Sequence, residues 1–164
     1  MRIGKQERRT RETEICVTID LDGSGKAKIA TGVGFLDHML NSFAVHGRFD
    51  LEVVVEKSDL EIDCHHTVED TGIVLGKAIG EALGDKAGIA RFGSFYIPMD
   101  EALSFAAVDI SGRPFLVYDN VHKNEMIGNY ETDMTEEFFR AVAFNAGMTL
   151  HLKSLYGTND HHRI

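Results

Sequence analysis

The sequence has no apolar stretch long enough to cross a membrane. A transmembrane helix needs about 20 consecutive apolar residues, and the chain contains no such run. The first six residues, Met1 to Gln6, also lack the apolar core of a secretory signal. We therefore expect a cytoplasmic protein and no membrane partner.

Cysteine and positive charge are both scarce. Cys16 and Cys64 are far apart in the sequence, which argues against a disulfide framework and against a paired-cysteine metal site. Lysine and arginine number 17 against 26 acidic residues, and the net charge is −9. We therefore expect no nucleic-acid partner. A small phosphorylated ligand remains possible, because a few arginines can hold one phosphate.

Histidine, by contrast, is abundant and clustered. Four of the eight histidines form two adjacent pairs, His65–His66 and His161–His162. The chain is 43% hydrophobic, which allows a sizeable core in a single domain.

The hydrophobic pattern of the first half predicts a regular series of elements. Residues 13–31 alternate on both sides of a turn at 22–25, which predicts a hairpin. Helical spacing follows over 34–47 and strand spacing over 50–56. A second helix is expected to begin at His65.

The second half repeats this order. Corresponding elements are expected at 102–109, 115–118, 135–147 and 148–155, followed by the second histidine pair. Glu12, Asp20 and Gly23 map with one constant offset onto Glu101, Asp109 and Gly112. We predict an α+β fold with an internally duplicated β-β-α-β-α unit and antiparallel or mixed sheets with helices on one face. The repeats would cover about 8–88 and 97–164 of one domain, and oligomerisation would protect the exposed sheet edges.

The first histidine pair has the order His65-His66-x-x-Glu69 at the expected helix start. His66 and Glu69 should share one helix face, whereas His65 lies about 100° away. One short segment can therefore serve two metal ions. Imidazole and carboxylate together suit a borderline divalent ion such as Mn²⁺, Fe²⁺ or Zn²⁺. The second pair lies at the equivalent place in the repeat, which strengthens the interpretation.

Purely structural interpretations exist for the same residues. Adjacent histidines can form a solvated helix start, and His38 can be a helix surface residue. His46 can be a helix C-terminal residue that interacts with the dipole. His151 alternates with leucines in an expected strand.

Five segments together resemble the imidazoleglycerol-phosphate dehydratase family. They are residues 34–40 (GFLDHML), 63–70 (DCHHTVED), 98–103 (PMDEAL), 111–114 (SGRP) and 147–151 (GMTLH). The resemblance covers nearly the whole chain. It implies the fold type of ribosomal protein S5 domain 2. It also implies a hydro-lyase of histidine biosynthesis that dehydrates imidazoleglycerol phosphate to imidazoleacetol phosphate.

The resemblance also implies a metal centre. The family uses two Mn²⁺ ions per active site, with other divalent ions as alternatives, and its sites are shared between subunits of a trimer or 24-mer. The matching ligands here are His38, His65, His66, Glu69, His161 and His162. Glu137 stands where the family often has a histidine, and it keeps a metal-binding atom.

The remaining residues implied by the resemblance act on a small phosphorylated imidazole substrate. Glu12 matches the catalytic base, and Arg91 and Arg113 match positions that hold the phosphate through planar guanidinium groups. His46 matches a residue near the substrate. Without the resemblance, Glu12, Arg91 and Arg113 would be read as solvated surface residues.

The expected chemistry explains the need for metal. The proton on C2 of the glycerol chain is not next to a carbonyl and is barely acidic. Metal on the imidazole ring can favour the imidazolate form. A ring electron pair can then expel the C3 hydroxyl, which gives a diazafulvene-like intermediate before a base takes the C2 proton. The roles of Asp100 and Glu101 stay open, and Glu101 can be a remnant of the duplicated site.

The internal repeat predicts a further element after the second histidine pair. The counterpart of Glu69 and of the helix that follows it, about 15 residues, would lie beyond Ile164. If the polypeptide lacks this helix, we expect weak metal binding, low activity and a trimer in place of the larger assembly.

Two other functions fit the histidine pairs. A metal-storage or metal-responsive module would bind ions without turnover, but it would have no use for Glu12, Arg91 and Arg113. A metallohydrolase with one metal-activated water would release phosphate from esters.

Overall fold

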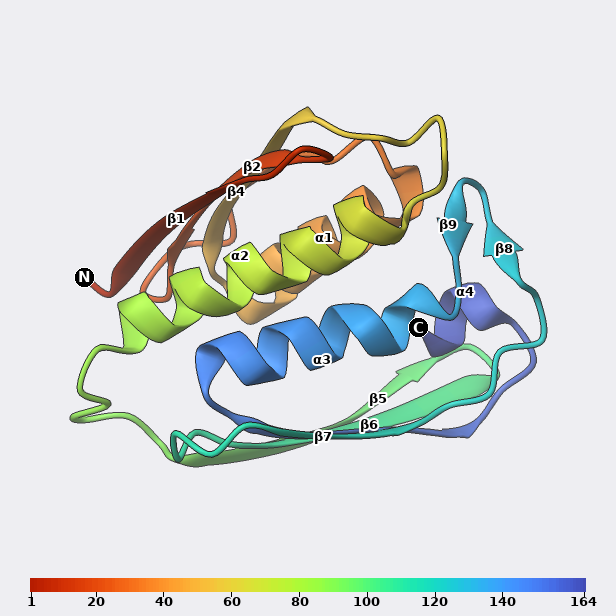
Figure 1. Ribbon diagram of the computed structural model, residues 1–164. Helices are drawn as coiled ribbons and strands as arrows, with labels where there is room; N and C mark the ends of the chain where they lie inside the picture. Colours follow the sequence, from red (N-terminus) through yellow and green to blue (C-terminus); the bar gives the residue numbers. More distant parts are fainter.

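The computed structural model describes residues 1–164 as two four-stranded sheets with helices between them (Figure 1). The first sheet contains β1 (Ile3–Arg9), β2 (Glu14–Asp20), β3 (Ala27–Ala30) and β4 (Asp50–Lys57). The second contains β5 (Phe92–Met99), β6 (Ala102–Asp109), β7 (Phe115–Asp119) and β10 (Thr149–Tyr156). The helices are α1 (Gly34–Gly47), α2 (His65–Leu83), α3 (Met134–Ala146) and α4 (Asp160–Arg163), and a small hairpin comprises β8 (Met126–Ile127) and β9 (Tyr130–Glu131). None of the helices has both the length and the apolar character needed to span a bilayer.

Both sheets have the same strand order. The first sheet has the order β1-β2-β4-β3, and the second has the order β5-β6-β10-β7. Strands at the same place in the two orders are counterparts in the two halves of the chain. In each sheet three strands are antiparallel, and the last strand pairs in parallel with its neighbour. Helices lie on the inner face of each sheet (Figure 1). The predicted α+β fold with a duplicated unit and mixed sheets is confirmed.

The strand pairing differs from the sequence prediction. The hairpin expected over 13–31 is wrong, because β4 lies between β2 and β3. The turn is fastened to β4 instead: Asp50 Oδ1 accepts hydrogen bonds from the N–H groups of Ser24 (2.7 Å) and Lys26 (3.0 Å). In the second half, β7 likewise pairs with β10 and not with β6. Alternation identifies a strand but does not identify its neighbour.

Each repeat also begins with a strand that the hydrophobic pattern did not predict. The exposed positions of β1 are mostly charged, and its most buried residue is Gly4. A Cβ on Gly4 would collide with the carbonyl of Ala78 in α2. The helix packs so closely on β1 that only glycine fits there. Because the buried position has no apolar side chain, the hydrophobic pattern does not indicate this strand.

The two halves are joined where α2 packs against α3. Gly72 and Gly76 of α2 face this contact, and a Cβ on either would lie 2.7 Å from the carbonyl oxygen of Phe138 or Val142. The glycines permit the close approach of the two helices. One hydrophobic core therefore contains residues of both repeats.

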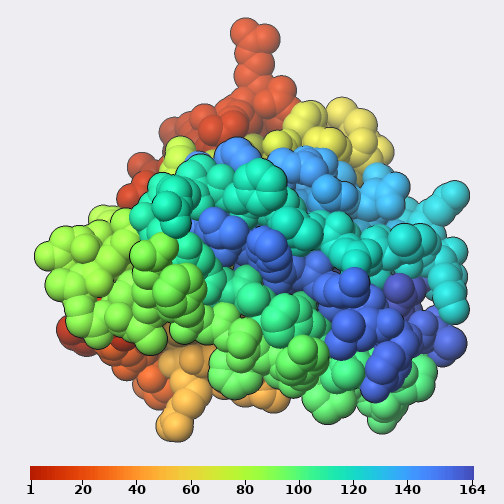
Figure 2. All heavy atoms as spheres, turned by 90° about the horizontal axis from the view of Figure 1, so that it is seen from below, coloured from red at the N-terminus to blue at the C-terminus, as the bar shows by residue number.

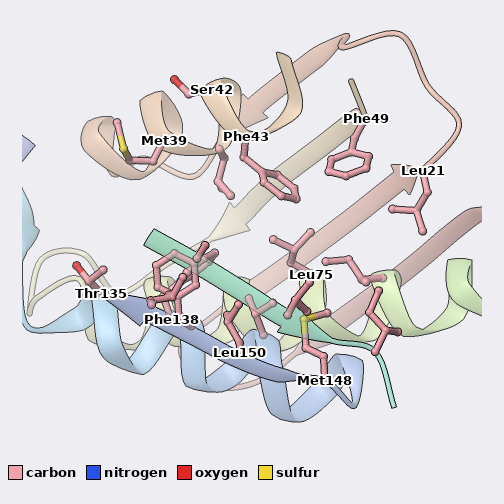
Figure 3. A pocket seen from close by; sticks show the side chains of 18 of the residues that line it. Leu21, Met39, Ser42, Phe43, Phe49, Leu75, Thr135, Phe138, Met148 and Leu150 are labelled. Carbon is pink, nitrogen blue, oxygen red and sulfur yellow. The ribbon is translucent and has the colours of Figure 1, made fainter. Parts of the chain in front are cut away.

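An apolar pocket of about 860 Å³ lies between α1, α3 and the inner face of the second sheet. In Figure 3, Met39 and Phe43 of α1 lie across the pocket from Phe138 of α3 and Leu150 of β10. The first sheet is covered by α1 and the 19-residue α2, and α3 lies on the inner face of the second sheet.

The outer face of the second sheet is exposed (Figure 2). Several of the exposed side chains on its strands are aromatic. Phe92 and Phe115 are 68% and 58% exposed, and the rings of Tyr96 and Phe105 pack 4.7 Å apart. Contiguous exposed apolar surface of this kind is typical of a protein–protein contact.

Candidate active site

The first histidine pair lies at the start of α2, as predicted, but one of its contacts differs. His66 Nδ1 lies 2.7 Å from Oδ2 of Asp59, a buried residue of the preceding loop. This hydrogen bond raises the pKa of His66, although burial opposes it. Glu69 Oε2 lies 3.5 Å from His65 Nε2, so the helical pair that forms is i,i+4 and not the expected His66–Glu69 pair. His66 is bound by Asp59 instead.

The second histidine pair lies at the start of α4. Asn159 accepts a hydrogen bond from the His161 N–H (3.0 Å). His162 Nδ1 is 2.9 Å from Oε2 of Glu101. The other oxygen of Glu101 accepts from the N–H groups of Thr158 (3.0 Å) and Asn159 (2.7 Å). The His162 contact, followed by these backbone bonds, holds the pKa of Glu101 well below its usual range.

His38 of α1 joins the second pair. The His38 and His161 ring centroids are 5.3 Å apart. Burial, followed by the charges of His38 and His162, lowers the pKa of His161 and favours its neutral form, the form that binds metal. These three histidines and His46 line a pocket of about 580 Å³.

The segment of residues 120–133, which includes β8 and β9, contacts all three histidine-bearing helix starts. The hydrogen bonds run from Glu131 N–H to Cys64 Sγ (3.4 Å), from Lys123 N–H to Asp160 Oδ2 (2.9 Å) and from Gly34 N–H to Asn129 Oδ1 (3.2 Å). Cys64, which is a free thiol, and Asp160 each directly precede a histidine pair. The segment therefore holds the starts of α1, α2 and α4 at one end of the molecule (Figure 1).

Arg91 and Arg113 meet at one carboxylate. Arg91 donates two hydrogen bonds to Asp109 (2.6 and 3.0 Å), and Arg113 Nη2 lies 3.5 Å from it. The Arg91 contact lowers the pKa of Asp109. Because two arginines share this one carboxylate, the three side chains together carry a net positive charge. Asp109 ends β6, whereas Glu101 immediately precedes β6. Eight extended residues span about 26 Å, so the arginines are far from His162 of the same chain.

The expected metal ligands form separate groups within one chain. His65, His66 and Glu69 form one group, and His38, His161 and His162 form another. No three His, Cys, Asp or Glu side chains are arranged to hold a metal ion. Glu137 is paired with Arg140. Glu12 is half-buried, and its charge makes a small contribution to the raised pKa of His66.

The chemistry of these donors fits a divalent ion. The His66 ring makes one hydrogen bond, through Nδ1, and Nε2 makes none. Imidazole nitrogens and carboxylate oxygens are the ligand types that borderline divalent metals prefer.

Comparison with known proteins decides the family. The imidazoleglycerol-phosphate dehydratase family model matches residues 31–164. The chain belongs to the imidazoleglycerol-phosphate dehydratase family. The imidazoleglycerol-phosphate dehydratase of Acetivibrio thermocellus is 64% identical over 157 residues, which cover 96% of this chain and 80% of the relative. That of Methylorubrum populi is 59% identical over 162 residues, with coverages of 99% and 83%.

Solved structures of the imidazoleglycerol-phosphate dehydratase family share the fold. The Staphylococcus aureus enzyme matches with a TM-score of 0.87 and 40% identity, covering 98% of this chain and 88% of that one. The Pyrococcus furiosus enzyme matches with a TM-score of 0.80 and 36% identity, with coverages of 95% and 82%.

Sequence reasoning missed two buried carboxylates beside the histidine pairs, Asp59 and Asp160. Asp59 lies in a loop without a periodic pattern, so nothing in the sequence signals its burial. Asp160 matches Cys64 in the repeat, and this equivalence was the one available sign of a packed position.

Proposed function

We propose that this protein is a hydro-lyase that dehydrates imidazoleglycerol phosphate to imidazoleacetol phosphate, a step of histidine biosynthesis. The observation that carries the proposal is the presence of two histidine pairs at equivalent helix starts in a chain of this family. Membership of the family indicates the reaction. The imidazole and carboxylate donors indicate that the reaction depends on a metal ion.

The proposed cofactor is a pair of Mn²⁺ ions per active site, with other divalent ions as alternatives. The residues that would hold the ions are His38, His65, His66, Glu69, His161 and His162, with Glu137 as a further ligand. When bound, such ions act as Lewis acids toward the imidazole ring of the substrate. Arg140 contacts Oε1 of Glu137, which leaves Oε2 for an ion.

Glu12 is the proposed base for the C2 proton. Its local backbone is fastened by Thr10 Oγ1, which accepts from the N–H groups of Glu12 (3.1 Å) and Thr13 (3.0 Å). The Glu12 carboxylate has no hydrogen-bond donor within the chain, unlike the carboxylate of its repeat mate Glu101. An ordered backbone positions the Glu12 side chain, and its carboxylate is free of competing hydrogen bonds; both features suit a general base.

Arg91 and Arg113 are the proposed phosphate ligands. Their guanidinium groups already lie side by side on Asp109, and their planar donors match phosphate oxygens. His46, on the wall of the same pocket as His38, is the proposed substrate contact near the imidazole end.

We propose that each active site combines residues from neighbouring copies, in a trimer or a 24-mer. Three observations support sharing: the ligands form separate groups, the arginines lie far from His162, and the second sheet has an exposed aromatic outer face. A closed symmetric assembly can bring such distant surfaces together.

A turnover assay tests the function. Protein loaded with Mn²⁺ is mixed with imidazoleglycerol phosphate, and the absorbance of the enolised keto product is followed. We expect Glu12→Gln to lower kcat by about 10²- to 10⁴-fold while Mn²⁺ binding is kept. Glu52→Gln, a change at an exposed carboxylate paired with Lys28, should leave kcat unchanged.

Three outcomes would contradict the proposal. Mn²⁺ binding without any product would favour metal storage, and phosphate release would favour a hydrolase. Full activity of Glu12→Gln would remove Glu12 as the base.

A further inference from the structure

His66 and His162 share a contact that the proposed reaction does not explain. Each is the second member of its pair, and each has Nδ1 bound by a carboxylate from outside its helix. The distances are 2.7 Å from His66 to Asp59 and 2.9 Å from His162 to Glu101.

Duplication of the unit does not account for this shared contact. Glu101 lies between β5 and β6, and its repeat mate is Glu12. Asp59 lies in the loop between β4 and α2. The same contact therefore comes from two unrelated positions, which indicates a requirement of the histidine itself.

The burial of Asp59 adds a second observation. Asp59 is 7% exposed, and its Oδ1 is buried without a hydrogen-bond partner. A buried carboxylate with an unpaired oxygen is destabilising, so local stability does not explain its presence. The oxygen that is paired, Oδ2, is the one that contacts His66.

The contact has a definite chemical consequence. A carboxylate can only accept, so Nδ1 must carry the hydrogen, and in the neutral ring Nε2 then keeps its lone pair. The His66 side chain is 50% exposed, and Nε2 makes no hydrogen bond. Histidines that bind metal through one nitrogen commonly donate from the other nitrogen to a carboxylate.

We propose that Asp59 is a positioning residue that fixes the tautomer and orientation of His66, presenting Nε2 to a divalent ion. We propose that Glu101 likewise fixes the tautomer of His162, whose Nε2 lies 3.5 Å from the Asn159 side-chain amide and would exchange that contact for the ion. This inference rests on the proposed function, because it assigns the two carboxylates to the metal centre of that function. Asp59 is the cleaner test, since Glu101 also binds the backbone of Thr158 and Asn159.

The experiment measures the tautomer of His66 and the affinity for Mn²⁺ in the assembled protein. Magic-angle-spinning NMR of ¹⁵N-histidine-labelled, metal-free protein distinguishes the tautomers, and His66→Gln assigns the signal. Free Mn²⁺ is counted by electron paramagnetic resonance. We expect Asp59→Ala to mix the tautomers and to weaken Mn²⁺ binding by about 10- to 100-fold. Asp59→Asn, which keeps an acceptor, should retain the tautomer with a smaller loss of affinity.

Asp70→Asn is the control for loss of a buried carboxylate. Asp70 is 6% exposed and binds Arg8 and Thr13, without a histidine contact. It should lower thermal stability and leave the His66 tautomer unchanged. If Asp59→Ala is poorly folded, Asp59→Asn decides by the same two measurements.

The outcomes separate this inference from the proposed function. An unchanged tautomer and unchanged Mn²⁺ affinity in Asp59→Ala, with an active wild type, would overturn the positioning role alone. A wild type without turnover would overturn the proposed function, and the tautomer measurement would still report on Asp59.

Discussion

Asp160 shows how a single buried side chain holds a functional helix start. Its carboxylate is 1% exposed and accepts hydrogen bonds from the N–H groups of Lys123 (2.9 Å) and Asn124 (2.8 Å). Asp160→Ala would leave both donors unpaired, so we expect a loss of about 3 kcal/mol in the free energy of unfolding. Denaturant titration measures it. Asp119→Ala, at an exposed pair with Lys153, should change stability by less than about 1 kcal/mol.

The stabilisation by Asp160 should depend on pH. Burial opposes its ionisation, but the hydrogen bonds from Asn124 and Lys123 outweigh burial and lower the pKa of Asp160. Its contribution is complete above the unfolded-state value of about 3.9. It is lost as pH falls toward and through the lower folded-state pKa. The stability difference between wild type and Asp160→Ala should therefore narrow in acid. A constant difference from pH 7 to pH 2 would contradict the assignment.

At the scale of elements, the contact between α2 and α3 depends on Gly72 and Gly76, and Gly80 of the same helix serves as the control. A Cβ at Gly76 would lie 2.7 Å from the carbonyl oxygen of Val142, whereas at Gly80 the nearest atom would be 3.4 Å away. We expect Gly76→Ala to destabilise the protein by about 1–3 kcal/mol through overpacking. Gly80→Ala should be neutral or stabilising by up to about 1 kcal/mol, because alanine favours a helix. Thermal unfolding of the two variants tests this. Equal changes in stability for the two variants would mean that helix propensity, and not packing against α3, determines the effect of the substitution.

The elements themselves were largely predictable. The helix expected over 34–47 matches α1, and the helix expected from His65 matches α2. The pairing of β3 with β4 was not predictable, because the strands that come together are separated by α1. Likewise, the short β4–α2 loop gave no sign that Asp59 would turn inward onto His66.

At the scale of the whole molecule, the separation of the two ligand groups predicts complementation between variants. His66→Ala and His162→Ala damage different groups, and each alone should abolish activity. If a site combines one group from each of two chains, co-refolding equal amounts should restore about a quarter of the sites. Turnover per subunit after mixing measures this. No recovery in assembled mixed oligomers would mean that both groups of one chain serve the same site.

The sequence alone determined the repeat, most of the strands and helices, the two histidine pairs and the family resemblance. These are properties of residues close together in the chain, where periodicity and spacing are visible. Only the tertiary structure decided the strand order, the carboxylate bound to each histidine and the distance of the arginines from His162. Those relations join residues from different elements, and they are set by packing of surfaces that no local pattern describes.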